Sequence, residues 1–408
     1  MEFKTAKLDN GLEIVAEVSE TAYSVAIGYF VQTGARDETD QESGISHFLE
    51  HMVFKGTPTR SALAVNRELD NMGGISNACT GEESTIFYAS VLPELEEKAV
   101  DLFSDLMRPS LSKEDFDMEK QVILEEISLY KDQPPFDADE KCREIFFQGH
   151  PLARSIGGTK ESVSALTIEQ MRDYFERQYS SDNITIVACG RVDFNKFVDD
   201  VARHCAHWKP YHKTRKTFRP RGKRGTYLMK RKSAAQEYLF QVTDAPCARD
   251  TDRYAASLLA NILGDETGSR IFWELVDSGR VDYAGLGFQE YSDAGTMCAT
   301  MSCDPEKISG NLTILRDVFR KAESDGIFEE ELERSKNKIL SRLVQAGERP
   351  RGRLFGVGIG WMQCREYYSV QNIIEIIRNL TVDDINAVLK KYPLSDPLTV
   401  AVGPLDTL

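Results

Sequence analysis

The feature that most constrains the fold is a weak internal repeat of a helix followed by a strand. Residues 165–193 and residues 379–406 each contain a Leu-Thr start, an amphipathic helix, a short polar break and an apolar strand that ends in glycine. The two threonines, Thr167 and Thr381, are 214 residues apart, and the closing glycines are 213 residues apart. A shared order at a nearly constant offset favours duplication of a unit of about 210 residues, so we predict two homologous halves.

A basic segment separates these halves. Residues 210–225 read PYHKTRKTFRPRGKRG, which is rich in Lys and Arg, poor in aliphatic residues and contains two prolines. This composition is typical of an exposed linker, although its charge would also allow contact with an acidic peptide. We therefore predict one domain at 1–209, a linker at 210–225 and a second domain at 226–408.

Expected strands and helices alternate in the first half. The segments 11–18 and 23–34 have alternating or continuous apolar residues, as strands do. Residues 43–56 change to a helical period, with one apolar stripe at positions i, i+3, i+4 and i+7. Strands mixed with long helices predict α/β layers in each half. The other expected elements are a strand at 84–92, a helix at 92–109 and a helix at 112–132, which Ser112 caps and Pro134 and Pro135 end.

Charge and hydropathy argue against two classes of protein. The formal net charge of −15 disfavours a general nucleic-acid binder, which needs a basic surface. No run of 18 apolar residues occurs, so we expect no membrane span. The first residues lack the pattern of a secretory signal and are typical of a first strand. Eight scattered cysteines without a C-x-x-C pair indicate reduced thiols, so we expect a cytoplasmic protein.

Three residues of the helix expected at 43–56 form a potential metal-binding motif. His47 and His51 are four residues apart, so their side chains share one face of the helix at a separation of roughly 6 Å. Two imidazoles at that spacing can bind one tetrahedral metal ion, and Glu50 can reach a water molecule beside it. The order H-x-x-E-H inverts the H-E-x-x-H zinc helix. The alternative is an ordinary polar helix face, although two of only six histidines fall here.

A catalytic zinc ion needs a third protein ligand and an open fourth position. The helix expected at 112–132 offers Glu119 and Glu126, which are seven residues apart and therefore lie on one face. Apolar residues lie between them, and a carboxylate in apolar surroundings needs a partner such as a metal. Glu125 is the rival ligand, and charged residues on a long helix commonly face solvent. Another possible metal group adjoins the linker but matches no strong zinc pattern: His204, Cys205 and His207.

These motifs resemble those of a known family. The sequence HFLEH at 47–51 is followed 75 residues later by Glu126 in EKQVILEE. The chain is similar to the pitrilysin (insulinase) family of inverted-motif zinc peptidases, and to its short two-domain members related to mitochondrial processing peptidase. The resemblance covers the whole chain and is most specific in 41–90 and 112–135. It implies an α+β fold of two homologous domains, each a mainly antiparallel sheet packed against helices, with the zinc motif only in the first.

The resemblance also implies a role for each residue of the motifs. Zn²⁺ would be held by His47, His51 and Glu126. Glu50 would act as the general base, and Glu119 would have a supporting role in catalysis.

The segment GGISNACT at 73–80 also matches the family. There it leads into an edge strand that pairs with the substrate peptide, which implies that Asn77 and Ala78 position the scissile bond. The alternative is a Gly-Gly turn before an ordinary strand.

One position in the second half departs from the family pattern. The family usually places an Arg and a Tyr seven residues apart, where they reach the substrate carbonyl. Tyr283 fits the Tyr position, which implies a hydrogen bond to the oxyanion, but Val276 stands where the Arg is expected. Either another arginine substitutes or a partner chain completes the site.

Together these residues and the resemblance predict a zinc metalloendopeptidase that hydrolyses unfolded or short peptides. Glu50 would take a proton from the attacking water and deliver it to the leaving amine. The resemblance further implies that two chains associate around a closed chamber, as a homodimer or as a heterodimer with a related chain. The alternatives are a non-catalytic structural subunit of a processing-peptidase-like complex and a zinc hydrolase for a non-peptide bond.

Overall fold

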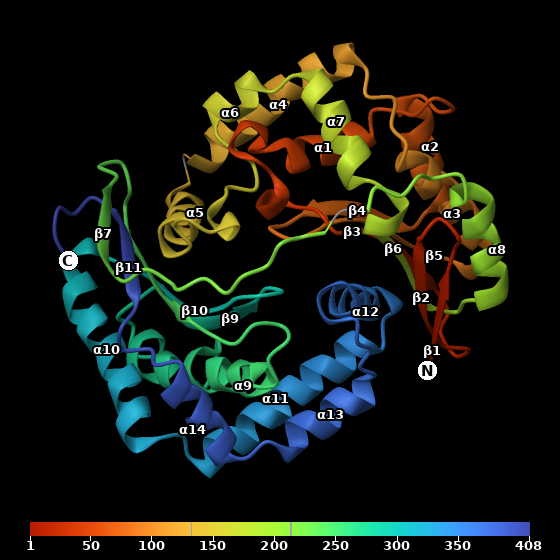
Figure 1. The fold of residues 1–408 in the computed structure, drawn as a ribbon. Helices are drawn as coiled ribbons and strands as arrows, with labels where there is room; N and C mark the ends of the chain where they lie inside the picture. Colours follow the sequence, from red (N-terminus) through yellow and green to blue (C-terminus); the bar gives the residue numbers. More distant parts are fainter. Residues whose placement is uncertain (132, 213) are drawn as a thin grey trace. The chain divides into compact units, whose positions relative to one another are not determined.

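The computed structural model describes residues 1–131, 133–212 and 214–408. The last residue of the helix expected at 112–132 and one position of the expected linker lie outside the described residues. The chain forms two compact units, and each unit contains segments from both halves of the sequence (Figure 1). Unit 1 comprises Met1–Ser128, Arg154–Lys216 and Val344–Ser369, and unit 2 comprises Leu129–Ala153, Thr217–Leu343 and Val370–Leu408.

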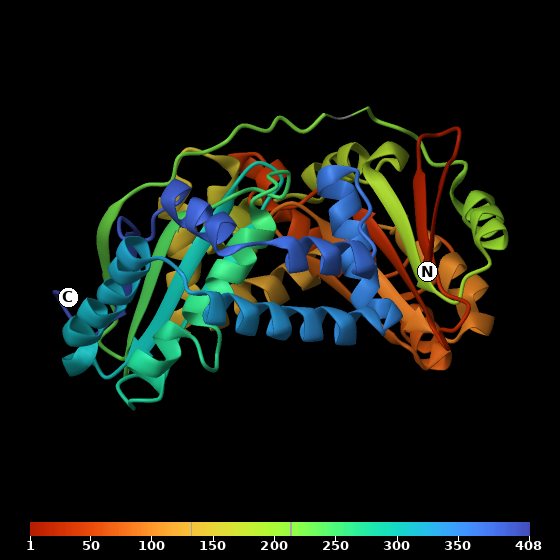
Figure 2. The same cartoon turned by 90° about the horizontal axis from the view of Figure 1, so that it is seen from below.

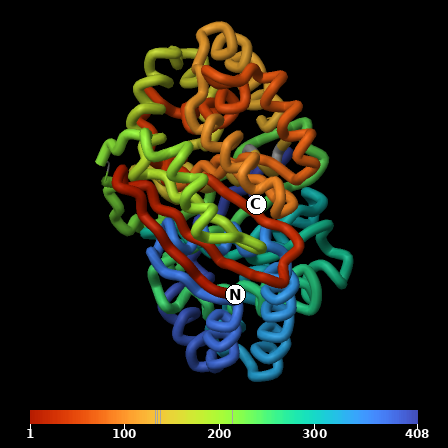
Figure 3. The backbone as a smooth tube through the Cα atoms, turned by 90° about the vertical axis from the view of Figure 1, so that its right-hand side faces the viewer, coloured from red at the N-terminus to blue at the C-terminus, as the bar shows by residue number. Residues whose placement is uncertain are grey.

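A six-stranded mixed sheet forms the centre of unit 1. Its strand order is β1-β2-β6-β3-β5-β4, in which β2 and β6 are parallel and all other neighbours are antiparallel. Figure 3 traces the two N-terminal strands as neighbouring red runs. In sheet order the strands are β1 (Glu2–Lys7), β2 (Glu13–Val18), β6 (Ile184–Gly190), β3 (Val25–Val31), β5 (Thr85–Val91) and β4 (Ile75–Thr80).

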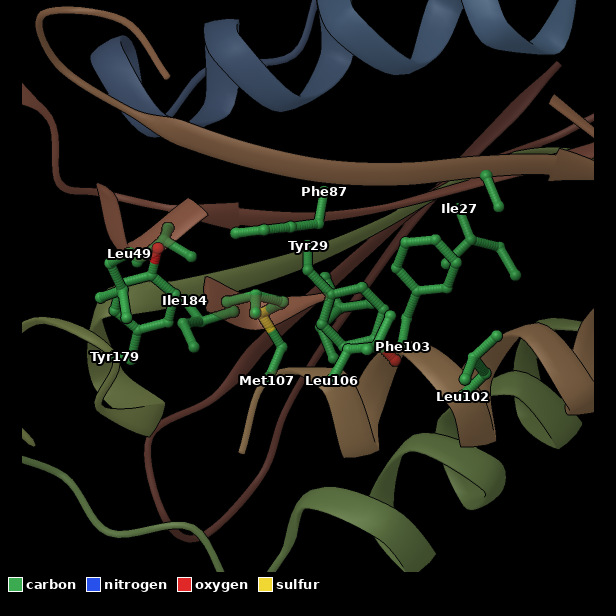
Figure 4. Close-up of a cluster of buried hydrophobic side chains, with 14 of the residues drawn as sticks. Ile27, Tyr29, Leu49, Phe87, Leu102, Phe103, Leu106, Met107, Tyr179 and Ile184 are labelled. Carbon is green, nitrogen blue, oxygen red and sulfur yellow. The ribbon is translucent and has the colours of Figure 1, made fainter. Parts of the chain in front are cut away.

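Both faces of this sheet are buried, which explains why β3 and β6 are continuous apolar runs. Alternate side chains point to opposite faces. On one face Ile27 and Tyr29 pack under several helices of unit 1, with Phe103 among their neighbours (Figure 4). On the other face Phe30 packs against Leu354 of α12. The helices of unit 1 are α1 (Ile45–Val53), α2 (Ala62–Met72), α3 (Glu96–Leu106), α4 (Lys113–Lys131), α6 (Lys160–Ala165), α7 (Ile168–Gln178), α8 (Phe194–Cys205) and α12 (Pro350–Cys364).

Unit 2 is built in the same way around a five-stranded sheet. The order is β7-β11-β8-β10-β9, with β7 and β11 parallel and the other neighbours antiparallel. Helix α5 packs on one face, and the other face forms a second core with α9, α10 and α14. The strands are β7 (Gly225–Lys230), β11 (Leu398–Gly403), β8 (Glu237–Asp244), β10 (Gly295–Cys303) and β9 (Tyr283–Glu290). The helices are α5 (Pro134–Phe146), α9 (Arg253–Gly264), α10 (Ile308–Asp325), α11 (Glu329–Gly347), α13 (Val370–Asn379) and α14 (Val382–Lys391).

The two sheets confirm the duplication predicted from the repeat. The order β2-β6-β3-β5-β4 of unit 1 corresponds to β7-β11-β8-β10-β9 of unit 2, with the same pattern of parallel and antiparallel pairs. The repeated sequence forms α7 and β6 in one unit, and α14 and β11 in the other. Both helices begin at the predicted threonines, because Thr167 accepts a hydrogen bond from Gln170 N and Thr381 accepts one from Asp384 N.

The units also exchange helices, which was not predicted. Helix α5 comes from the first half of the sequence but covers a face of the sheet of unit 2. Helix α12 comes from the second half but covers a face of the sheet of unit 1. In unit 1, the Arg353 guanidinium on α12 donates two hydrogen bonds, at 2.8 and 2.6 Å, to the buried Glu17 carboxylate on β2. The expected limits of the two duplicated halves, at 1–209 and 226–408 with a linker at 210–225, remain a prediction.

The basic segment between the halves has no regular secondary structure at 208–212 and 214–224 (Figure 2). Most of its residues are exposed, but Arg215 is held in unit 1 by Asp37, at 2.5 Å between Nη2 and Oδ2. Farther along, Phe218 N donates to Asp293 Oδ2 in unit 2 at 3.0 Å. The segment is therefore anchored at specific residues on both of its sides.

Candidate metal centre

Helix α1 presents one face to the core of unit 1 and leaves the opposite face open. Ile45, Phe48, Leu49 and Met52 are buried, in the predicted stripe, and each buried side chain of this size stabilises the helix position by about 1.5–3 kcal/mol. Leu49 lies in the core cluster with Phe87 and Tyr179 (Figure 4). The open face therefore carries the three polar residues of the HFLEH motif.

The start of α1 is fixed by a buried carboxylate. Glu38 accepts hydrogen bonds from Gly44 N and Ser46 N, both at 2.8 Å, so it binds the free amides of the first turn. Gly44 has a φ of +91°, and a Cβ atom there would lie 2.8 Å from the carbonyl oxygen of Gly157. Burial raises the pKa of Glu38 to about 8, although both backbone hydrogen bonds oppose the rise.

His47 and His51 lie side by side on the open face of α1. Their ring centroids are 4.7 Å apart with an interplanar angle of 75°, as expected for residues one turn apart. Burial lowers the pKa of His47, and His51 lowers it further while Glu126 opposes the change. A neutral imidazole is the form that binds a metal ion.

Helix α4 brings two glutamates to this face. His51 Nδ1 is 3.0 Å from Glu119 Oε1, and Glu119 Oε2 is 2.5 Å from Lys55 Nζ. Burial tends to raise the pKa of Glu119, but the bonds from Lys55 and His51 outweigh it and hold that pKa below its usual value. A charged Glu119 fixes the ring of His51 so that Nε2 remains available as a ligand.

Glu126 completes a group of three donor atoms. Its Oε2 lies 3.9 Å from His47 Nε2 and 3.7 Å from His51 Nε2. Among the residues that the structure describes, this is the one group of three or more His, Cys, Asp or Glu residues whose ligand atoms all lie within 4.8 Å of one another. The rival Glu125 is exposed and is not part of it.

The donor set fits a zinc ion. Tetrahedral zinc with bonds of about 2.0–2.2 Å separates its ligand atoms by roughly 3.4 Å, so small side-chain shifts would complete the geometry. Two imidazoles and one carboxylate leave a fourth position open, as in catalytic rather than structural zinc sites. The other group considered from the sequence is not arranged in this way, since Cys205 is buried and its thiol donates to Ser104 Oγ.

Glu50 lies beside the three donors without being one of them. Its Oε2 accepts a hydrogen bond of 2.5 Å from Thr80 Oγ1. Burial raises the pKa of Glu50, and the charge of Glu126 adds to the rise, while Thr80 and His51 lower it. A partly buried carboxylate next to an open metal position is suited to accept a proton.

The Thr80 hydrogen bond also shows where the expected substrate strand lies. Thr80 is the last residue of β4, which pairs with β5 and forms one edge of the sheet of unit 1. Asn77 and Ala78 lie in the middle of this strand, and Asn77 Oδ1 accepts a hydrogen bond from Ala78 N at 2.8 Å. The strand is thus at an edge, as expected, and next to Glu50.

The second-half positions lie in unit 2. Tyr283 is the first residue of β9 and its side chain is half exposed. Val276, which stands at the expected arginine position, ends a π-helical turn (η6, Phe272–Val276) and packs against the core of unit 2. The role of Tyr283 stays a prediction.

Three contributors to this site were not predicted from the sequence: Glu38, Lys55 and Thr80. Thr80 and Lys55 act through partners far along the chain, such as Glu50, which is 30 residues from Thr80, whereas Glu38 binds amides 6 and 8 residues away. An acidic residue just before a helix that has no side-chain cap of its own could have indicated Glu38.

The fold and the site together define a class: an α+β protein of two units, one of which carries an inverted H-x-x-E-H motif that faces a glutamate helix. Comparisons with known proteins agree with this class. Residues 13–160 match the family described as "Insulinase (Peptidase family M16)", and residues 165–339 match "Peptidase M16 inactive domain". A protein of Rickettsia felis named "Uncharacterized zinc protease" is 32% identical over 407 residues, which cover 99% of this chain and 98% of the relative. The chain therefore belongs to the insulinase family, peptidase family M16, and the resemblance seen in the sequence is confirmed.

Solved structures confirm the predicted α+β fold. A protease from Helicobacter pylori has a TM-score of 0.92 at 20% identity, with 99% of each chain covered. A chain in the structure of complex III2 from Candida albicans has a TM-score of 0.83 at 17% identity, with 99% of this chain and 96% of that chain covered. Among the described residues, no helix combines the length and apolar character that crossing a membrane requires.

Proposed function

We propose that this chain is a zinc metalloendopeptidase that hydrolyses unfolded or short peptides, with Glu50 as the general base. The observation that carries the proposal is the meeting of His47, His51 and Glu126, with Glu50 held beside them by Thr80. Relatives named as zinc proteases support the same reading.

Each side chain has a distinct part in the proposed reaction. His47, His51 and Glu126 would hold the zinc ion, and Glu119 would orient His51. The bound zinc ion would supply Lewis-acid chemistry, lowering the pKa of water to about 7 and polarising the peptide carbonyl.

Glu50 would move the proton. Its carboxylate accepts a proton from the attacking water and later donates it to the amine that leaves. Burial raises its pKa, so its affinity for that proton is greater than that of an exposed glutamate.

The substrate would bind as an extended strand. In this proposal it pairs with the free edge of β4, where Asn77 and Ala78 set the position of the scissile bond. Tyr283 would donate a hydrogen bond to the oxyanion. Because Val276 replaces the family arginine, either another arginine of this chain or a residue of a second chain would complete that contact.

We further propose that two chains work together in the cytoplasm, as a homodimer or with a related chain. The likeness to a chain of complex III2 raises a second candidate function, a structural subunit without catalysis. The complete set of donors and Glu50 supports the enzyme over that candidate, since a purely structural subunit has no need of them.

The test is hydrolysis of a mixture of unstructured peptides by the purified chain, with Glu50→Gln as the inactive control and Glu125→Gln as the matched surface control. We expect cleavage that a chelator abolishes, that Glu50→Gln nearly abolishes while zinc stays bound, and that Glu125→Gln preserves. Substantial cleavage by Glu50→Gln would reject Glu50 as the base. No cleavage with zinc bound would indicate a required partner chain, and neither cleavage nor zinc would favour the structural role.

A further inference from the structure

The two equivalent sheets differ at one edge. In unit 1 the strand β2 lies between β6 and β1, so β1 closes that side of the sheet. Its counterpart β7 in unit 2 pairs with β11 in the same parallel manner, but within the described residues no strand lies on its other side. The sheet of unit 2 therefore lacks the sixth strand that the sheet of unit 1 has.

The register shows which backbone groups of β7 remain open. Gly190 of β6 and Gly403 of β11 are the equivalent closing glycines of the repeat. Val18 of β2 pairs with Gly190, and Lys230 of β7 pairs with Gly403, so Val18 and Lys230 occupy equivalent positions. Arg231 N donates to Gly403 O at 2.7 Å, and amides along a strand alternate in direction. Tyr227 and Met229 therefore face β11.

The amide and carbonyl groups of Thr226, Leu228 and Lys230 face outward. Under the same alignment, Ala16 of β2 corresponds to Leu228 and is paired with Lys4 of β1. Ala16 is fully buried, whereas 39% of Leu228 is exposed. An exposed edge with outward amides and apolar side chains is a template for the addition of another strand.

The basic residues around β7 favour a negatively charged segment at this edge. No Asp or Glu occurs between Asp200 and Glu237, in a chain of net charge −15. Arg224 and Lys230 are paired with Asp244 and Asp406, but Lys223 and Lys232, which are exposed, lie on the two flanks of β7.

A second copy of β7 would bring this basic region against itself, which is unfavourable. An extended segment with acidic residues at both ends has the complementary charge. We propose that β7 is the docking edge for an extended acidic segment of a partner protein, which adds antiparallel to β7 as the sixth strand of this sheet. This edge belongs to unit 2 and the metal centre to unit 1, and the proposal does not depend on the proposed peptidase activity.

The test uses the full chain and a fluorescent peptide of about ten residues, whose alternating Val and Thr core is flanked by Asp and Glu. The matched peptide has the same core flanked by Lys and Arg. Fluorescence anisotropy measures binding to the wild type and to two variants. Leu228→Pro removes one outward amide but leaves the amides that face β11, and Pro is tolerated on an edge strand. The double variant Lys223→Glu, Lys232→Glu keeps the backbone and reverses the charge of the flanks.

We expect the acidic peptide to bind and the basic peptide not to bind. Each variant should weaken binding by roughly tenfold or more, and added salt should weaken binding to the wild type. Hydrogen exchange on the wild type gives a readout that does not depend on the folding of a variant. Bound peptide should protect the amides of Thr226, Leu228 and Lys230, while those of Tyr227 and Met229 are protected in the free chain.

Several results would overturn the proposal. Equal binding of both peptides, or no binding, would reject an acidic occupant. Binding that Leu228→Pro does not affect, without protection of the outward amides, would show charge attraction without strand addition. Self-association of the chain that Leu228→Pro abolishes would show that a second copy occupies the edge.

Discussion

Replacing Glu119 by Gln tests how the metal centre is held. In the wild type, Glu119 Oε1 is 3.0 Å from His51 Nδ1 and Oε2 is 2.5 Å from Lys55 Nζ, in a buried position. The amide of Gln can still accept from His51, but it carries no charge and its NH₂ group would face the Lys55 ammonium. Loss of such a partner of a metal-binding histidine weakens metal affinity by about 10- to 100-fold, or about 1.4–2.7 kcal/mol.

The assay is competition for zinc with a fluorescent chelator at fixed pH and salt. The comparison variant is Lys55→Met, which removes the cation but leaves the bond between Glu119 and His51, so its loss of zinc affinity should be smaller than that of Glu119→Gln. Zinc binding by Glu119→Gln as tight as that of the wild type would refute the reasoning. An equal loss in Lys55→Met would show that the cation, and not the carboxylate at His51, determines the affinity.

Three further predictions concern α12, a buried carboxyl group and the base. Arg353→Met leaves the buried Glu17 without its cationic partner, with only the Tyr367 hydroxyl still donating to it, and should cost about 3–5 kcal/mol in urea unfolding. The double variant with Glu17→Leu should recover most of this cost, and additive costs would contradict the reasoning. Burial raises the pKa of Glu96 to about 7 from 4.5, so the folded state binds this proton more tightly than the unfolded state. The free energy of unfolding therefore decreases as the pH rises from about 4.5 to 7. Glu96→Gln should raise the melting temperature more at about pH 8 than at about pH 4.5. An equal change at both pH values would exclude this cause. Thr80→Val removes the hydrogen bond to Glu50 and should lower kcat by about tenfold with zinc content unchanged; an unaltered kcat would exclude a role for this bond.

Much of the fold could be predicted because its signals are local. The apolar stripe of α1 and the threonine caps of α7 and α14 depend on residues within one or two turns, and they have the positions expected. The exchange of α5 and α12 could not be predicted in this way. An apolar helix face shows that a helix is covered, but it does not show which sheet covers it.

Some residues of the candidate site could likewise be predicted from local spacing, and others could not. His47, Glu50 and His51 stand at positions i, i+3 and i+4 of one helix, so their spacing alone places them on one face. Spacing along α4 left Glu125 as a rival to Glu126, and the structure brings only Glu126 to the histidines. Contacts such as that of Thr80 with Glu50 join separate elements, and spacing along the chain carries no signal for them.

The measurement that tests the central claim most directly is the zinc content of the purified chain, measured by inductively coupled plasma mass spectrometry after dialysis. The account predicts one zinc ion per chain in the wild type and in Glu125→Gln, and almost none in Glu126→Gln or in a variant that lacks His47. Zinc retained by Glu126→Gln but lost from Glu125→Gln would contradict the assignment of the third ligand. A wild-type chain that binds no zinc would contradict the metal centre itself.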